Sequence, residues 1–97
     1  MFKNKIAMSK QSKLLHKILQ GLADKNIAFD DLRSLLKKLG FSERISGGHY
    51  IFFKDGIAEI INLQPNNENN AKAYQVKQVR EIIEKYNLTI TKFDDND

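Results

Sequence analysis

The sequence predicts an α+β domain in which a three-stranded antiparallel sheet packs one face on helices, with the elements in the order α-α-β-β-β-α. Leucines recur at helical spacing up to Gly40, apolar and polar residues alternate after it, and helical spacing returns near the end of the chain. A small sheet must cover one face with helices, so its other face is left to solvent or a partner. The 97 residues suffice for one domain, which we expect to span residues 1–93.

The first helix is expected to begin at Ser9 or Ser12, either of which can cap it, and to run to about Leu22. Gly21 and the polar residues after it end the helix. His16 lies outside the apolar face and is expected on the surface. That apolar face has core spacing and consists of Leu14, Leu15, Ile18, Leu19 and Leu22.

A second helix is expected to begin where Asp30 or Asp31 accepts its free amide groups. Lysines in its last turn complement the helix dipole, and Gly40 supplies the left-handed residue that ends it. Phe41 should then pack back on Leu36. The apolar face is formed by Leu32, Leu35, Leu36 and Leu39.

Three strands are expected to follow as a meander. The first covers residues 41–45, and residues 46–48 (SGG) turn the chain because glycine adopts positive φ at little cost. The second covers residues 49–54. The pair Asp55-Gly56 is typical of a two-residue hairpin, after which residues 57–63 pair back. Alternation in the second strand puts His49, Ile51 and Phe53 on one face and Tyr50, Phe52 and Lys54 on the other.

The rest of the chain is predicted to be a loop, a helix and a tail. Residues 64–70 (QPNNENN) are too polar to bury the surface that would order them. The last helix runs from about Ala71 to Tyr86. Residues 89–93 either add an edge strand or trail into the acidic end, and disorder is expected over residues 94–97.

Composition excludes several classes of protein. The chain has no cysteine, which rules out disulfides and thiolate zinc sites, and two histidines argue against a multi-histidine metal site. No apolar run approaches the length of a membrane span, and the N-terminus lacks the apolar region of a secretory signal. We therefore expect a cytoplasmic location, no membrane partner, and neither metal nor cofactor.

The charge points toward a polyanionic partner. Sixteen Lys and Arg against twelve Asp and Glu give a net charge of +4, and residues 94–97 (DDND) hold three of the acids. The remaining body is accordingly more basic, and nucleic acid is the usual partner of such a surface. Solubility alone explains a charge of this size equally well.

The usual signatures of hydrolases are absent. No G-x-S-x-G nucleophile motif occurs, and residues 46–48 precede a strand, whereas a phosphate-binding glycine loop opens a helix. The adjacent carboxylates Asp30 and Asp31 are explained by helix capping, and those at Asp94 and Asp95 by a solvated tail.

RNA cleavage demands less, because the nucleophile is the substrate's own 2′-hydroxyl. The protein then needs one proton-transfer group and cations for the phosphate. An imidazole suits this proton transfer, so His49 is the catalytic candidate. The main-chain amides of Gly47 and Gly48 can approach a phosphate closely. The candidate phosphate-binding side chains are Arg44, Lys54, Lys72 and Lys77.

These residues also have structural explanations. His49 can simply begin a strand, and the glycine pair can simply form a turn. The aromatic residues at 50, 52 and 53 either stack on bases or belong to the core. A non-catalytic RNA-binding module, or a protein that only docks another protein, therefore stays an alternative.

Together, the order of elements and the motif resemble the HicA toxins of bacterial type II toxin–antitoxin systems. Residues 35–41 (LLKKLGF) are similar to a family helix ending in L-G-F, and residues 47–52 (GGHYIF) to its G-S-H-H-x-F signature. Residues 62–65 (NLQP) and 74–80 (YQVKQVR) are similar to segments of a longer branch of the family. The resemblance covers roughly residues 29–88.

The resemblance implies a double-stranded-RNA-binding-domain-like fold and a metal-independent endoribonuclease that cleaves mRNA. The catalytic first histidine of the signature maps to His49. A HicB antitoxin covering the active site is implied as partner, with a monomer when free and a hetero-oligomer when bound. Two positions depart from the signature: Gly48 stands for a common serine and Tyr50 for the second histidine. Residues 1–26 form an extra N-terminal helix, which either packs on the domain or binds the antitoxin.

Overall fold

The computed structural model describes residues 9–90 of the chain. The predicted order of helices and antiparallel strands is confirmed. The elements are α1 (Lys10–Gln20), the short 3-10 helix η1 (Asp24–Asn26), α2 (Phe29–Lys38), β1 (Ser42–Ser46), β2 (His49–Phe53), β3 (Ile61–Leu63) and α3 (Ala73–Tyr86). None of the described helices is long and apolar enough to cross a membrane.

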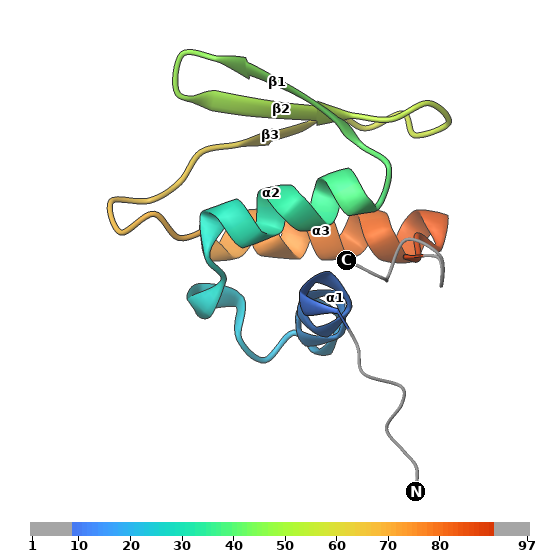
Figure 1. Cartoon of the computed structure of the whole chain (residues 1–97), viewed down its shortest axis with the longest axis horizontal. Helices are drawn as coiled ribbons and strands as arrows, with labels where there is room; N and C mark the ends of the chain where they lie inside the picture. The colour runs from blue at the N-terminus through green and yellow to red at the C-terminus, as the bar shows by residue number, and fades with distance from the viewer. Residues whose placement is uncertain (1–8, 91–97) are drawn as a thin grey trace, which may run out of the picture.

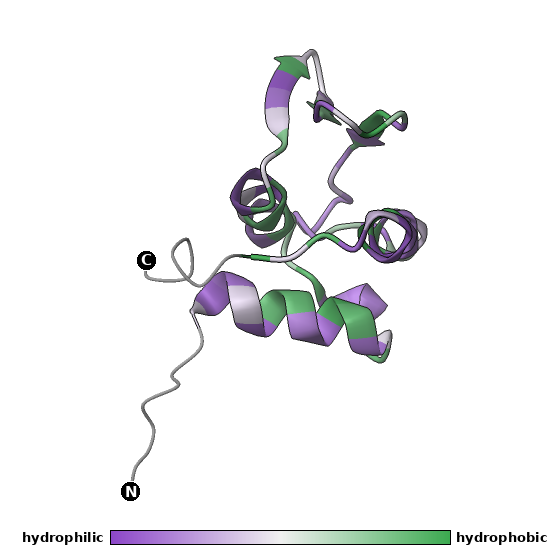
Figure 2. Cartoon of the chain, turned by 90° about the vertical axis from the view of Figure 1, so that its right-hand side faces the viewer, coloured by the Kyte–Doolittle hydropathy of each residue, from purple (hydrophilic) through white to green (hydrophobic). Residues whose placement is uncertain are grey.

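The elements form three layers. The sheet, in the order β1-β2-β3, lies above α2 and α3, and α1 crosses beneath these two helices (Figure 1). Figure 2 shows the apolar sides of α2 and α3 facing the space between the layers, while their polar sides face outward. The core residues between the layers include Phe29, Leu32, Leu35, Leu36, Phe52, Ile61, Leu63, Val76 and Val79.

Helix α1 begins at the first of its two predicted caps. The Ser9 hydroxyl accepts the Ser12 amide at 3.1 Å. Ile18 is fully buried, but Leu19 is 40% and Leu22 87% exposed, so the prediction that both belong to the core is wrong. The reason is that α1 ends at Gln20 and, as the outermost layer, meets the domain along one edge only.

Helix α2 begins earlier than either predicted cap. Its N-cap is Ala28, and the first helical residue is Phe29, whose amide donates to Asn69 O at 3.0 Å. The prediction of Asp30 or Asp31 as cap is therefore wrong, because burial of the Phe29 ring fixes the start one residue before them. Both aspartates lie in the first turn, where they complement the helix dipole.

The end of α2 is as predicted. Gly40 has φ +101°, its amide donates to Lys37 O at 3.0 Å, and the Phe41 amide donates to Leu36 O at 3.0 Å. These are the two bonds of a Schellman motif, which satisfy carbonyls that the helix leaves free. Phe41 is buried beside the leucines of α2 and precedes β1.

The third strand is shorter than residues 57–63. Residues 57–60 lie outside β3, because their polar groups bond elsewhere. The Ile57 amide donates to Lys54 O at 3.1 Å, which closes the turn at Asp55 and Gly56. The Ala58 amide donates to the Tyr86 hydroxyl at 3.3 Å, so this stretch bonds to α3 in place of β2.

The asparagine-rich loop has a defined structure, contrary to the prediction from its polarity. Asn66 Oδ1 accepts the amides of Glu68 and Asn70, both at 2.9 Å, and the Asn66 amide donates to Asn70 O at 2.9 Å. These bonds lie within the loop, which therefore needs little buried surface to hold its shape. The Ala71 amide donates to Ile27 O at 2.8 Å, so α3 begins at Ala73 and not at Ala71.

Two predictions concern the C-terminal end of the chain. Thr89 and Ile90 form no strand. Residues 91–93 of the same predicted edge strand, and the tail 94–97, lie outside the described residues.

A carboxylate also attaches the connection between β2 and β3 to α3. Glu59 accepts Lys85 Nζ at 2.7 Å and the Tyr86 hydroxyl at 2.5 Å. These two donors, Lys85 first, lower the pKa of Glu59 from 4.5 to about 2. A carboxyl with a lowered pKa stabilises the fold above its unfolded pKa, and this contribution is lost as the pH falls from about 4.5 toward 2.

Replacing Tyr86 by phenylalanine should raise the pKa of Glu59, because one hydrogen bond to the charged form is removed. The value should stay below 4.5, since Lys85 remains. A carbon-13 NMR titration of the Glu59 carboxyl measures this. The matched control is Tyr74→Phe, which removes a hydroxyl from an exposed tyrosine of the same helix. An equal Glu59 pKa in Tyr86→Phe and the unmutated chain would contradict the assignment.

Candidate active site

A two-residue turn places His49 at the first position of β2. The strands pair with Ser46 opposite His49, and Gly47 and Gly48 connect them. Gly47 has φ +60°, a left-handed conformation that favours glycine, and a Cβ there would meet nothing within 4 Å. The requirement for glycine at this position is thus conformational. The predicted turn is confirmed at Gly47 and Gly48, whereas Ser46, which was predicted to lie in the turn, is the last residue of β1.

His49 lies on the open face of the sheet. Tyr50 and Phe52 point toward the helices, so alternation turns His49, Ile51 and Phe53 the other way. The His49 side chain is exposed, and its Nδ1 lies 3.1 Å from Asn62 Oδ1. Among residues 9–90, Nε2 of His49 has no hydrogen-bond partner. One ring nitrogen is therefore held by β3 while the other faces solvent.

Among the four side chains predicted to bind phosphate, Arg44 lies nearest to His49 along the sheet. It pairs with Ile51 across β1 and β2, which makes it a diagonal neighbour of His49 on the same face. Side chains in that relation are within reach of one another when one of them is long. Arg44 forms no ion pair with any described residue, so its charge is available to an anion.

The three predicted lysines are dispersed. Lys54 follows the far end of β2, about 16 Å along the strand from His49, beside the turn at Gly40. Lys72 is the N-cap residue of α3, whose first turn lies at the same end of the molecule as the Gly47–Gly48 turn (Figure 1). Lys77 is exposed farther along α3. The structure brings Arg44 and the two glycines to His49, and leaves Lys54 at the other end of the sheet.

Tyr50 is directed away from the face that carries His49. Its ring packs edge-on against Phe29, with centroids 4.9 Å apart, and Arg33 lies over it at 4.6 Å. Arg33 also donates to Glu43 at 2.7 Å and so lowers the pKa of this carboxyl. A side chain at position 50 thus belongs to the helix side of the sheet. Of the three aromatic residues considered for base stacking, only Phe53 is exposed on the open face.

Gln75 supports the His49 end of the sheet from the side that α3 covers. It is a buried polar residue of α3. In the side-chain orientation that satisfies both of its polar atoms, Nε2 donates to Gln64 O at 3.0 Å and Oε1 accepts the Gln64 amide at 3.2 Å. Gln64 in turn lies against Gly48, where a Cβ would be 3.6 Å from its side-chain nitrogen. The turn that presents His49 is therefore backed by the first turn of α3.

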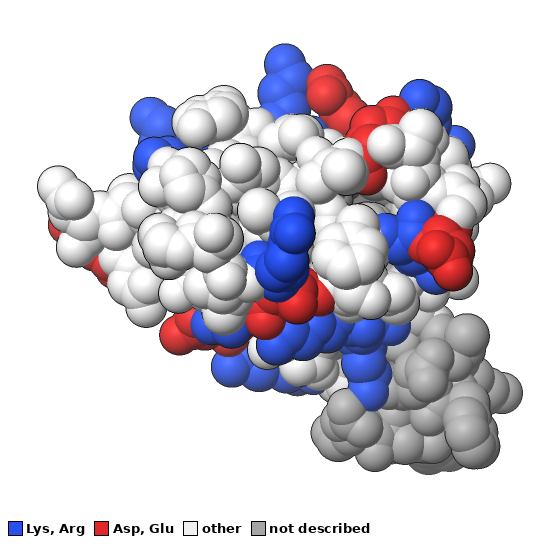
Figure 3. Space-filling model, turned by 90° about the horizontal axis from the view of Figure 1, so that it is seen from above, with Lys and Arg blue, Asp and Glu red and all other residues white. Residues whose placement is uncertain are grey.

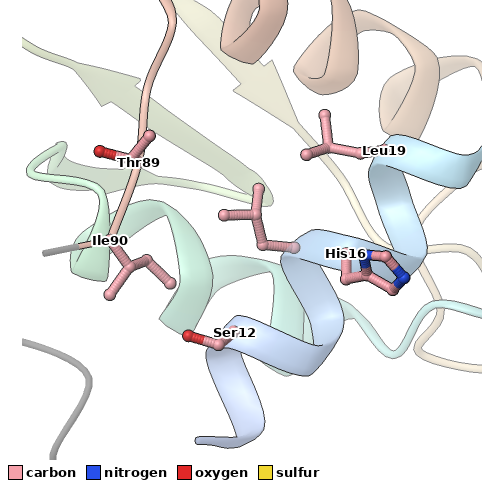
Figure 4. Close-up of a pocket in the computed structure, with 6 residues that line it drawn as sticks. Ser12, His16, Leu19, Thr89 and Ile90 are labelled. Carbon is pink, nitrogen blue, oxygen red and sulfur yellow. The ribbon is translucent and has the colours of Figure 1, made fainter. Parts of the chain in front are cut away.

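Seen from above, this side of the molecule is mostly uncharged. Lys and Arg side chains are scattered singly over it, Asp and Glu side chains lie beside some of them, and more Lys and Arg side chains lie along its margin (Figure 3). A hollow of about 240 Å³ lies elsewhere, between α1 and the end of the described chain (Figure 4). It is lined by Ser12, Leu15, His16, Leu19, Thr89 and Ile90.

Within residues 9–90, no three His, Asp or Glu side chains gather where they would hold a metal ion.

Asn62 is a site residue that sequence reasoning missed. The available signal was its position between Ile61 and Leu63, since a polar residue between two buried ones in a strand must face outward.

Comparison of the chain with protein-family models, with curated proteins and with solved structures found no match.

Proposed function

We propose that the chain is a HicA-like endoribonuclease, the toxin of a toxin–antitoxin pair, which cleaves mRNA without a metal. The observation that carries the proposal is the environment of His49. One ring nitrogen is bonded to Asn62 and the other is open to solvent on an uncovered sheet face. A base held in this way is accessible to a polymer, which a deep pocket would exclude.

The reaction requires two proton transfers, one from the attacking 2′-hydroxyl and one to the departing 5′-oxygen. His49 accepts the proton of the 2′-hydroxyl, whose oxygen then bonds to the adjacent phosphorus. The bond from phosphorus to the 5′-oxygen breaks, that oxygen takes up a proton from water, and His49 returns its own proton to the solvent. The products are a 2′,3′-cyclic phosphate and a 5′-hydroxyl end, and no external nucleophile is consumed.

Phosphate binding is assigned to groups near His49. Arg44 stabilises the negative charge that grows on the phosphate oxygens, and the amides of Gly47 and Gly48 add donors that no side chain obstructs. Lys72 extends the positive charge toward α3, with Lys77 behind it. We assign Lys54 to a more distant phosphate, since it lies at the other end of β2.

The partners follow from the same proposal. The order of α2, the three strands and α3 supports a double-stranded-RNA-binding-domain-like fold. We propose a HicB-type antitoxin that covers the open face, a monomer in its absence and a cytoplasmic location. Helix α1 packs on α2 and α3, on the opposite side of these helices from the sheet, so an antitoxin on the open face would not contact it.

A second candidate is an RNA-binding module without activity. The exposed side chain of Phe53 is the observation that favours it, because an aromatic residue on an open sheet can stack on a base without any chemistry. This module would retain RNA in a strongly salt-dependent manner and release it uncut.

Incubating the purified chain with an end-labelled single-stranded RNA in EDTA tests the proposal. We expect shortened products that end in a 2′,3′-cyclic phosphate, and none from DNA of the same sequence. Expression in a bacterial host should arrest growth. Uncut RNA that is bound at low salt and released at high salt would favour the second candidate, and RNA that is neither cut nor bound would contradict both.

A further inference from the structure

We infer that Asn62 is a positioning residue that fixes the tautomer of His49. Its amide oxygen holds the hydrogen on Nδ1, so that the lone pair of Nε2 faces the open side of the sheet. The consequence for cleavage rests on the proposed function, but the tautomer itself does not.

The fold leaves Asn62 little choice of direction. Its neighbours Ile61 and Leu63 are both fully buried against the helices, so Asn62 projects from the other face of β3. Asn62 pairs with Ile51 across β2 and β3, and His49 lies two residues along β2 on the same face. The two side chains are therefore diagonal neighbours, and Oδ1 meets Nδ1 at 3.1 Å.

The chemistry of the two groups determines which nitrogen carries the hydrogen. An amide oxygen only accepts hydrogen bonds, so Nδ1 must be the donor. A neutral imidazole has a single N–H, and Nε2 is then left with its lone pair. This is the nitrogen without a partner among the described residues, which makes it the atom that takes the proton from the substrate.

A neutral acceptor suits this face better than a carboxylate would. The outward-facing residues of the three strands include Arg44 and Ser46 beside His49, but no Asp or Glu. An aspartate at position 62 would hold the same tautomer and at the same time repel the phosphate. Asparagine orients the ring without adding a negative charge next to the anion that must bind there.

The tautomer is measured directly by long-range proton–nitrogen NMR correlation at a pH where both imidazoles are neutral. His16 is an internal reference, since it is exposed and has no hydrogen-bond partner in the described part of the chain. We expect a protonated Nδ1 and an unprotonated Nε2 for His49, and a different pattern for His16. Asn62→Ala should make the two histidines alike, while Asn62→Asp should preserve the His49 pattern.

Two results would overturn the inference. One is a His49 pattern in the unmutated chain that equals that of His16 or shows the hydrogen on Nε2. The other is an unchanged His49 pattern in Asn62→Ala. Neither readout needs RNA, so a chain that shows the expected tautomer and does not cleave would contradict the proposed function alone.

Kinetics separate positioning from binding. Asn62→Ala should lower kcat about tenfold with KM unchanged, a part of the roughly hundredfold or more that a positioned general base supplies. Asn62→Asp should restore kcat but raise KM, because the added charge repels RNA. The matched control is Asn67→Ala in the exposed loop, which should change neither. Equal kcat in Asn62→Ala and Asn67→Ala would show that the contact has no role in cleavage.

Discussion

Replacing His49 by glutamine is expected to lower kcat for RNA cleavage by roughly 10²–10⁴, the contribution of a general acid or base in the transition state. Glutamine keeps a polar side chain on the open face but cannot take up the 2′-hydroxyl proton. Because the residue lies at the exposed start of β2, outside the core, the variant should fold as the unmutated chain does. Single-turnover cleavage of an end-labelled RNA measures the change.

The control for His49→Gln is His16→Gln, which removes the other histidine of the chain. His16 is exposed on α1, on the far side of α2 and α3 from the sheet, so its replacement should leave cleavage unchanged. RNA retention by His49→Gln should also be unchanged, since Arg44 and the glycine amides remain. Cleavage by His49→Gln within twofold of the unmutated rate would show that the base lies elsewhere.

Replacing Gln75 by leucine is expected to lower the free energy of unfolding by about 2 kcal/mol. Leucine fills a similar volume but pairs with neither the amide nor the carbonyl of Gln64, and an unpaired buried polar group costs about 1–3 kcal/mol. Urea denaturation at 25 °C measures this. Gln78→Leu is the matched control on the same helix, where we expect a change within about 0.5 kcal/mol because Gln78 is only partly buried.

The same variant links the core to the site. Gln64 lies between Gln75 and Gly48, so loss of the Gln75 amide should loosen the turn that presents His49. We therefore expect Gln75→Leu to lower the rate of RNA cleavage, measured below 37 °C, where the protein is still folded. Gln78→Leu should leave this rate unchanged. A destabilised variant with an unaltered cleavage rate would show that the turn is rigid without this support.

Much of the fold followed from local patterns in the sequence. Gly40 and Phe41 were predicted correctly because a helix end is determined by a few adjacent residues. The predicted length of the third strand was wrong because distant residues compete for a polar group. Ala58 bonds to Tyr86, 28 residues away, and this shortened β3 in a way that no local pattern signals.

The candidate site was predictable in part for the same reason. The turn before His49 and the start of a strand at this residue depend on adjacent residues, and both were predicted. The contact with Asn62 joins residues 13 positions apart and depends on the register of β2 and β3, which the shorter third strand altered. Single-sequence reasoning also ranked Lys54 with Arg44, although the strand separates them to different parts of the sheet.

The attachment of α1 has a consequence for the order in which the chain folds. Arg80 of α3 donates to Ile18 O at 3.1 Å and holds Asp24 through both carboxylate oxygens, so it completes the end of α1 across a separation of 62 residues. Contacts this distant in sequence form late, because the intervening chain must first be ordered. On the ribosome, α1 can pack on α2 but lacks this anchor until α3 has emerged. A truncated product that ends before residue 80 lacks this anchor altogether, although it contains His49, Asn62 and the whole sheet.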